Sequence, residues 1–234
     1  MQENSREQLH DPRQDAAAGR WRALIYLSIA ELLALSLWFS ATAVLPALSR
    51  EWQLGDSGRA GLTIAVQLGF IIGTLLSALG NLPDVYSPRV IMAGSAAAGA
   101  AANAALALWV DSLAPALALR ALTGIAMAGA YPPAMKIMAT WFRSGRGLAM
   151  GILIGALTVG SATPHLIRGI TDLPWRETLL AASLLALLGC AIVLVLIREG
   201  PYRFPAARFD IRMAGAIFRE RGLRLACFGY FGHM

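Results

Sequence analysis

Six apolar stretches dominate this sequence of 234 residues, and each is long enough to cross a lipid bilayer. A spanning helix needs about 20 mainly apolar residues, each adding ~1.5 Å of length. Stretches of this length and composition are therefore candidates for membrane-spanning helices. The sequence therefore predicts an all-α fold, a multi-span membrane helix bundle. The six spans are expected near residues 22–47, 58–80, 89–110, 113–140, 147–168 and 177–197.

The composition agrees with an integral membrane protein. Hydrophobic residues make up 57% of the chain and charged residues 15%, which is too little charge to cover the surface of a soluble domain. We attribute the net charge of +6 to membrane orientation and to anionic lipid headgroups, and not to nucleic acid binding. Cys190 and Cys227 both lie in apolar runs, so we expect no disulfide, no metal site and no cofactor.

Arginine residues divide unequally between the two sets of connectors. The tail, the second and fourth connectors and the segment after the sixth span carry most of them. The other set carries only Arg50, Arg59, Arg168 and Arg176. Since positive charge accumulates on the cytoplasmic side, the first set is expected inside. We expect a multi-pass protein of a bacterial cytoplasmic membrane with its amino terminus inside.

The chain divides into four expected segments. Residues 1–21 are polar and are expected to form a cytoplasmic tail, followed by the transmembrane bundle over residues 22–197. Residues 198–222 are basic with apolar residues at helical spacing, which predicts a cytoplasmic linker with an amphipathic helix on the inner leaflet. Residues 223–234 are apolar but too short for a span, so they are expected to be the truncated start of a seventh helix.

The two halves of the bundle contain a weak internal repeat. An offset of 87 residues carries Gly73 onto Gly160 and the run 57–59 (Ser-Gly-Arg) onto 144–146. Because three spans reverse the direction of the chain, this offset predicts two inverted three-helix repeats.

Two ionisable residues lie deep within predicted spans, Glu31 in the first and Arg120 in the fourth. Such residues cost at least a few kcal/mol to insert, so they are functional candidates. A carboxylate that meets the two aqueous sides in turn can take up and release a proton. We predict that Glu31 is a proton-coupling site and that Arg120 either tunes it or holds an anionic group of the substrate. The alternative for Glu31 is a structural hydrogen bond to a neighbouring helix.

Several other residues in the spans are candidates for the substrate pathway. Trp38 and Tyr131 could stack on a substrate. Gln67 and Asn103 either line a cavity or form hydrogen bonds between helices.

The residues from Arg120 to Gly151 carry a recognisable pattern. It contains R-x-x-x-G from Arg120 to Gly124, Gly129 followed by the run 131–133 (Tyr-Pro-Pro), a Trp-Phe pair at 141–142, and Arg-Gly at 146–147. This segment resembles the fourth span and following loop of the major facilitator superfamily.

Two further segments are similar to the same family. The connector with Gly80, Asp84 and Arg89 resembles its G-x-x-x-D loop, although no basic residue directly follows Asp84. The fifth span, with Gly155, Gly160 and Pro164, resembles the glycine-rich fifth span of many members.

The resemblance implies the amino-terminal six-helix half of a twelve-helix secondary transporter that works by alternating access. Its expected partners are the lipid bilayer, a small-molecule substrate, the proton and a second six-helix half. The resemblance also implies that Glu31 and Arg120 face a central cavity. The positions expected to act in gating and conformational change are Gly80, Asp84, Arg89, Gly124, Arg146, Gly155, Gly160 and Pro164.

The sequence does not identify the substrate more closely than as a small solute. Residues 229–234 resemble the start of the seventh span in anion-oriented members, so organic and inorganic anions are among the candidates. A competing interpretation is a non-transporting or defunct truncated membrane protein, or an assembly partner. An enzyme is not expected, because Ser161 with His165 lacks the arrangement of a serine hydrolase. A channel is disfavoured because no ring of like charges or carbonyl filter occurs.

Overall fold

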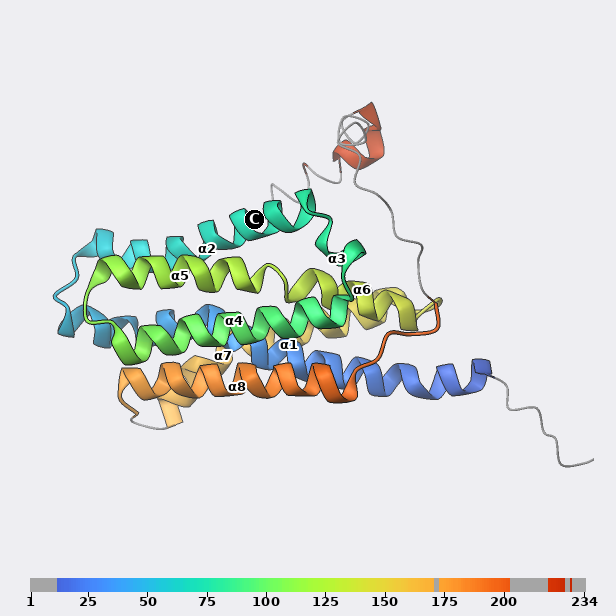
Figure 1. Ribbon diagram of the computed structural model, residues 1–234, viewed down its shortest axis with the longest axis horizontal. Helices are drawn as coiled ribbons and strands as arrows, with labels where there is room; N and C mark the ends of the chain where they lie inside the picture. The colour runs from blue at the N-terminus through green and yellow to red at the C-terminus, as the bar shows by residue number, and fades with distance from the viewer. Residues whose placement is uncertain (1–11, 171–172, 203–218, 226–227, 229–234) are drawn as a thin grey trace, which may run out of the picture.

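The computed structural model describes residues 12–170, 173–202, 219–225 and 228 (Figure 1). This part of the chain contains helices and connecting turns and no strand, which confirms the predicted all-α class. The helices are α1 (Pro12–Glu51), α2 (Asp56–Leu79), α3 (Leu82–Val85), α4 (Pro88–Trp109), α5 (Leu113–Met127), α6 (Tyr131–Trp141), α7 (Arg146–Ile170) and α8 (Trp175–Leu196).

Six segments of the described chain are long and apolar enough to cross a membrane, which confirms the six predicted spans. Every boundary falls within four residues of its predicted position. The spans are Gly19–Glu51, Asp56–Leu79, Pro88–Trp109, Leu113–Trp141, Arg146–Ile170 and Trp175–Leu196.

The ends of the chain differ from the sequence expectation. Helix α1 begins at Pro12, so half of the expected polar tail is helical. The amphipathic helix expected within 198–222 falls mainly on residues 203–218, which lie outside the described residues. Of the expected seventh span, only residues 223–225 and 228 are described.

The fourth span is not one continuous helix, because it breaks between α5 and α6. The amides of Gly129 and Ala130 donate to carbonyls three residues back, instead of four, at 3.0 Å each. Pro132 and Pro133 follow at the start of α6 and have no amide hydrogen, so two bonds of the α-helical ladder cannot form there. The predicted helix over 113–140 is therefore two helical segments, α5 and α6, that together form one span.

The helices form an antiparallel bundle in which α1 packs along α7 and α8, α2 along α5, and α4 along α5 and α8 (Figure 1). This pairing is the one that two inverted three-helix repeats require. The contact of the second span with the fourth (α2 with α5) corresponds to the contact of the fifth with the first (α7 with α1).

Glycines bring these helix pairs into backbone contact. A Cβ at Gly69 or Gly124 would lie 2.0 Å from a carbonyl oxygen of the facing helix, of Ala121 and Val66 respectively. Only a residue without a side chain allows α2 and α5 to approach so closely, as is common in membrane helix packing.

The outward faces of the bundle are apolar. Leu68, Ile71 and Leu75 on α2 and Leu184 and Val195 on α8 are each more than half exposed. In water such a surface would drive aggregation, whereas lipid tails cover it without cost. The exposed surface thus agrees with the membrane assignment from span length.

Candidate functional site

Arg120 is completely buried and joins α5 to α1. Its Nη1 donates to the carbonyl oxygen of Leu37 at 3.1 Å, and its Nη2 donates to that of Trp38 at 2.6 Å. Its Nε is also buried and has no hydrogen-bond partner. Both carbonyls belong to the interior of α1, where they already take part in the helix ladder. The guanidinium group therefore fixes one helix on the other through two neutral acceptors.

Glu31 is buried in α1, with 1% of its surface exposed. Its Oε2 has no hydrogen-bond partner. Glu31 and Arg120 do not form an ion pair, and the carbonyls that Arg120 binds lie six and seven residues further along α1, which is ~9–10 Å at helical rise. The structure thus brings the two predicted charges into the same part of the bundle without direct contact.

Glu31 and Arg120 are enclosed by the bundle, whereas the sequence predicted that they face a central cavity. Both were expected to face a shared hollow, but this bundle alone covers almost all of their surface. For Glu31, the close approach of α7 and α8 to α1 accounts for this burial. A Cβ at Gly160 of α7 would lie 2.6 Å from the carbonyl oxygen of Leu32, and one at Gly189 of α8 would lie 3.0 Å from that of Ala30.

The other predicted pathway residues are more accessible. Trp38 is half-buried, and its ring meets Phe70 of α2 edge-on with centroids 5.0 Å apart. Tyr131 begins α6 and is half-buried, whereas Gln67 is exposed on α2. Trp38 and Arg120 are thus brought together through the Trp38 carbonyl, and Gln67 lies on the surface of the bundle.

The predicted loop motif lies at the junction of α2, α3 and α4. Gly80 ends α2, and Asn81 then takes a left-handed conformation with φ of 48°. Asp84 lies in α3, and its side chain is outside the described part of the structure. Arg89 donates from Nη2 to the carbonyl oxygen of Leu194 in the last turn of α8. A cation at a helix carboxyl terminus is favourable, so Arg89 links α4 to the end of α8.

The remaining predicted gating positions occupy different environments. Gly124 and Gly160 lie against the backbone of a facing helix, and Pro164 is buried in α7. Gly155 is exposed, and a Cβ added there would meet no atom within 4 Å. Arg146 donates from Nε to the carbonyl oxygen of Phe142 at 2.6 Å.

Asn103 is part of a buried polar cluster in the middle of the bundle and forms hydrogen bonds between helices. Its Nδ2 donates to the carbonyl oxygen of Leu179 at 2.9 Å and to Ser183 Oγ at 3.0 Å. Ser40 Oγ donates to Asn103 Oδ1 at 2.8 Å. Asn103 therefore joins α1, α4 and α8 by hydrogen bonds. The two serines gave no signal in the sequence, because Ser is common in membrane helices.

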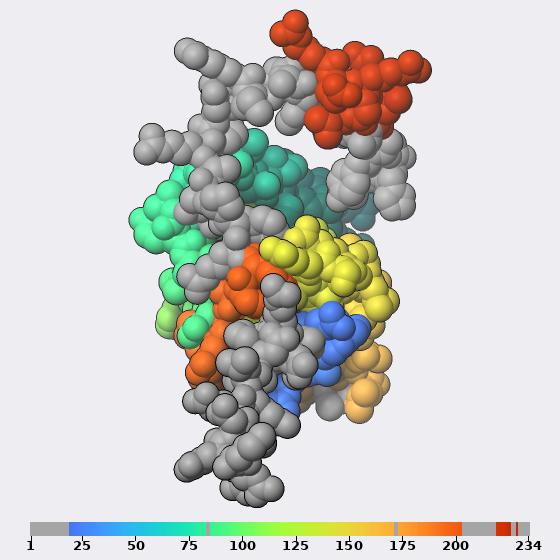
Figure 2. All heavy atoms as spheres, turned by 90° about the vertical axis from the view of Figure 1, so that its right-hand side faces the viewer, coloured from blue at the N-terminus to red at the C-terminus, as the bar shows by residue number. Residues whose placement is uncertain are grey.

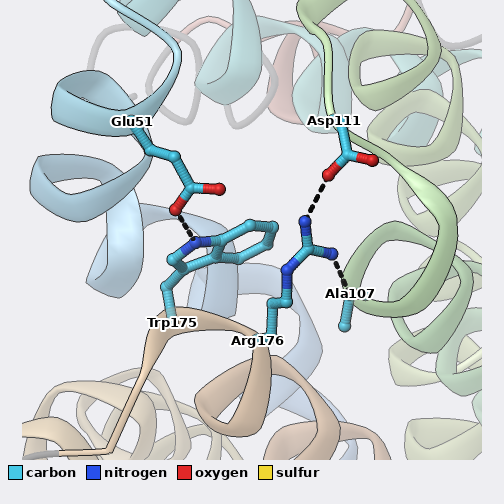
Figure 3. A network of polar contacts seen from close by, with 5 residues as sticks. All are labelled: Glu51, Ala107, Asp111, Trp175 and Arg176. Atoms are coloured by element: carbon cyan, nitrogen blue, oxygen red, sulfur yellow. Dashed lines mark hydrogen bonds and ion pairs between the residues drawn. The ribbon is translucent and has the colours of Figure 1, made fainter.

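A second network that sequence reasoning missed closes the end of the bundle where α8 begins (Figure 3). Trp175 Nε1 donates to Glu51 Oε2 at 2.6 Å. Arg176 donates to the carbonyl oxygen of Ala107, pairs with Asp111 and lies over the Trp175 ring with Cζ 4.3 Å from its centroid. The network ties the ends of α1 and α4 to the start of α8.

Comparisons with known proteins agree with this architecture. The family model described as Major Facilitator Superfamily matches residues 27–234. The puromycin resistance protein pur8 of Streptomyces alboniger is 32% identical over 196 residues, which cover 78% of this chain and 36% of that protein. The chain thus spans about a third of the length of this curated relative.

A solved structure has the same fold. It is the inward-facing, unoccupied structure of a bacterial homolog of the human lysosomal transporter Spinster. The TM-score is 0.67 at 19% identity, over 87% of this chain and 49% of that chain. The family match covers most of the sequence and all but the start of the first span, and the helix arrangement is the same. The chain belongs to the Major Facilitator Superfamily, a family of membrane transporters.

Proposed function

We propose that this chain is part of a proton-coupled secondary transporter of a small organic solute, in which Glu31 carries the proton. Family membership supports transport in general. Proton coupling is supported by the burial of Glu31, whose Oε2 has no hydrogen-bond partner. The buried Arg120 nearby does not form an ion pair with it.

The environment of Glu31 suits a group that changes its protonation state. Burying an unpaired ionised carboxylate costs far more than burying the neutral acid. The enclosed arrangement is therefore the one that a proton-loaded Glu31 would favour. Loss of the proton then requires water or a cation to reach the carboxylate, which calls for separation of the helices around α1. Coupling to a ~100 mV potential supplies about 2.3 kcal/mol for each charge moved.

Arg120 has a different role in this proposal. Its two terminal nitrogens are already used by the carbonyls of Leu37 and Trp38, so it positions α1 and does not hold the substrate. If Arg120 does not hold the substrate, the resemblance of residues 229–234 to anion-oriented members is the remaining argument for an anionic substrate.

The similarity to pur8 supports a small organic solute as the substrate class. The printed name of that relative links it to puromycin resistance, which makes export of puromycin the first activity to test in this protein. Trp38, Tyr131 and the exposed Gln67 are the side chains that we propose to contact the solute. A second six-helix half completes the pathway in this proposal, since both relatives are much longer than this chain.

The residues predicted to act in gating and conformational change also belong to this proposal. We propose that Gly80, Asp84 and Arg89 hold the connector between α2 and α4 in one state, through bonds such as that from Arg89 to Leu194. Gly124, Arg146, Gly155, Gly160 and Pro164 would allow or limit sliding of helices between states.

The test is transport by the protein as its gene encodes it, in inverted vesicles from bacterial cells. We expect puromycin accumulation that collapses when a protonophore removes the proton gradient. Glu31→Gln should abolish gradient-driven accumulation while retaining solute exchange, because exchange needs no net proton movement. Arg120→Lys should reduce both activities, because lysine lacks the two separate nitrogens with which Arg120 binds the carbonyls of Leu37 and Trp38.

Asp111→Asn serves as the control variant, because Asp111 lies at the exposed end of the bundle. Unchanged gradient-driven accumulation in Glu31→Gln would reject the proton role of Glu31. If another solute accumulates and puromycin does not, the proposed substrate class is rejected and the proton role of Glu31 is not.

A further inference from the structure

The end of the bundle where α1 begins also contains the end of α6 and the segment that follows α8 (Figure 2). The ring of Trp141 packs against Gly19, where a Cβ would lie 2.9 Å from Trp141 Cζ3. Trp141 Nε1 donates to the carbonyl oxygen of Arg198 at 2.9 Å. These contacts bring three arginines from distant parts of the chain together, and we name Arg20, Arg143 and Arg198 the basic corner.

Arg20 lies against two aromatic rings that also contact each other. Its Cζ lies 5.5 Å from the centroid of Trp21 and 5.6 Å from that of Phe142, and the two rings meet edge-on. Its Nε is buried without a hydrogen-bond partner. A cation on an aromatic face keeps its charge and its in-plane N–H groups available. Arg20 is thus oriented without being neutralised.

Arg143 is held in a similar way by the segment after α8. Its Cζ lies 4.6 Å from the centroid of Tyr202. Tyr202 is fixed because its amide donates to the carbonyl oxygen of Thr140 at 3.0 Å. The amide of Gly200 donates to Thr140 Oγ1 at 2.7 Å. The backbone of residues 198–202 is therefore attached to the end of α6, which sets the position of the exposed Arg198 and Arg143.

Two arginines at the opposite end of the bundle form ion pairs. There Arg176 pairs with Asp111 and Arg59 lies 3.7 Å from Asp56. At the basic corner, by contrast, none of the three arginines forms an ion pair within the described chain. Glu199 is the nearest acidic residue along the sequence, and it accepts a hydrogen bond from Ser87 Oγ at 2.8 Å. The corner therefore presents positive charge that the described residues do not compensate.

We propose that the basic corner is a binding site for the phosphate headgroup of an anionic phospholipid. The charge fits a phosphodiester, to which guanidinium groups donate paired hydrogen bonds. The location fits as well, because the corner lies at the end of three spans, where headgroups are. Trp21 is 42% exposed beside Arg20, as expected for an aromatic residue of the membrane interface. The partner is thus a lipid of the leaflet that this end faces.

The experiment measures lipid binding to the purified chain in detergent by native mass spectrometry. The probes are dioleoyl phosphatidylglycerol and dioleoyl phosphatidylcholine, titrated separately. We expect the first phosphatidylglycerol to bind more tightly than phosphatidylcholine. The double variant Arg20→Gln/Arg143→Gln should lose about thirtyfold in phosphatidylglycerol affinity, which corresponds to ~1 kcal/mol for each arginine.

Two matched variants separate charge at this site from charge in general. Arg20→Lys/Arg143→Lys should retain most of the preference, because it keeps both charges. Arg50→Gln/Arg59→Gln removes two charges from the opposite end and should leave the affinity unchanged. Equal affinity of the wild-type chain for the two lipids would overturn the proposal, as would an equal loss in both glutamine variants.

If Arg20→Gln/Arg143→Gln fails to fold, the wild-type chain still provides a test. The preference for phosphatidylglycerol should then fall when the ionic strength rises from about 0.05 to about 0.5 M, because the interaction is electrostatic. A preference that does not depend on salt would contradict the proposed site.

Discussion

A Cβ at Gly160 of α7 would lie 2.6 Å from the carbonyl oxygen of Leu32 in α1 and 2.9 Å from its Cα. Gly73 of α2 has the same relationship with Ile125 of α5, at 2.6 Å and 2.8 Å. Gly73 and Gly160 are also the two glycines that the 87-residue offset superimposes. The repeat in the sequence thus corresponds to one kind of contact between the two three-helix repeats, for which each repeat provides the glycine once.

This contact predicts a strong effect of Gly160→Val. The valine cannot fit without separating α7 from α1, so we expect a loss of about 1–3 kcal/mol of stability, or more, from overpacking. Gly155→Val is the matched control on the same helix, since nothing lies within 4 Å of its Cβ position. Unfolding in detergent with increasing denaturant measures both. Equal stability of the two variants would show that the α1–α7 contact is not as close as described.

The polar cluster around Asn103 predicts a second effect on stability. Asn103→Ala removes three hydrogen bonds and leaves Ser40 and Ser183 with bonds only to carbonyls of their own helices, so we expect a loss of about 1–2 kcal/mol. Gln67→Ala removes an exposed amide from α2 and should change stability little. The same unfolding assay compares them. A neutral Asn103→Ala would mean that Asn103 does not hold α1, α4 and α8 together.

In the network of Figure 3, the two partners of the ion pair, Arg176 and Asp111, are expected to contribute unequally to stability. The Asp111 side chain is 80% exposed, so Asp111→Asn should cost less than about 1 kcal/mol and lose its effect at high salt. Arg176→Gln should cost more, because it also removes the bond to Ala107 and the contact with the Trp175 ring. Stability at about 0.05 and about 1 M NaCl separates the two contributions. The result contradicts the network if Asp111→Asn is the more damaging change.

The distribution of arginine predicts the orientation in the membrane. The structure places Arg143 at the end of the bundle with the basic corner, and Arg59 at the opposite end (Figure 1). In a background with Cys190→Ser and Cys227→Ser, Arg59→Cys should react with an impermeant thiol reagent added to intact cells. Arg143→Cys should react only after the cells are opened. The reverse pattern would place the amino terminus outside.

Span length and turn residues were enough to predict the six helices, because a membrane helix must satisfy its backbone within one continuous apolar segment. The break at Gly129 and Ala130 was not predicted, although Pro132 and Pro133 gave a usable signal. Helix α1 extends back to Pro12 for a related reason. Residues 12–18 are too polar to count as a span, and polarity does not prevent a helix.

The sequence by itself determined the fold class, the number and order of spans, and the presence of Glu31 and Arg120 at membrane depth. These properties depend on residues close together in the chain, and lipid leaves few alternatives for such segments. Only the tertiary structure decided that Arg120 binds the carbonyls of α1 and that Glu31 is enclosed without a partner for its Oε2. Those outcomes depend on how closely helices approach across contacts such as Gly160 with Leu32. The distance between two helices depends on many packing contacts, so it cannot be predicted from a single segment of the sequence.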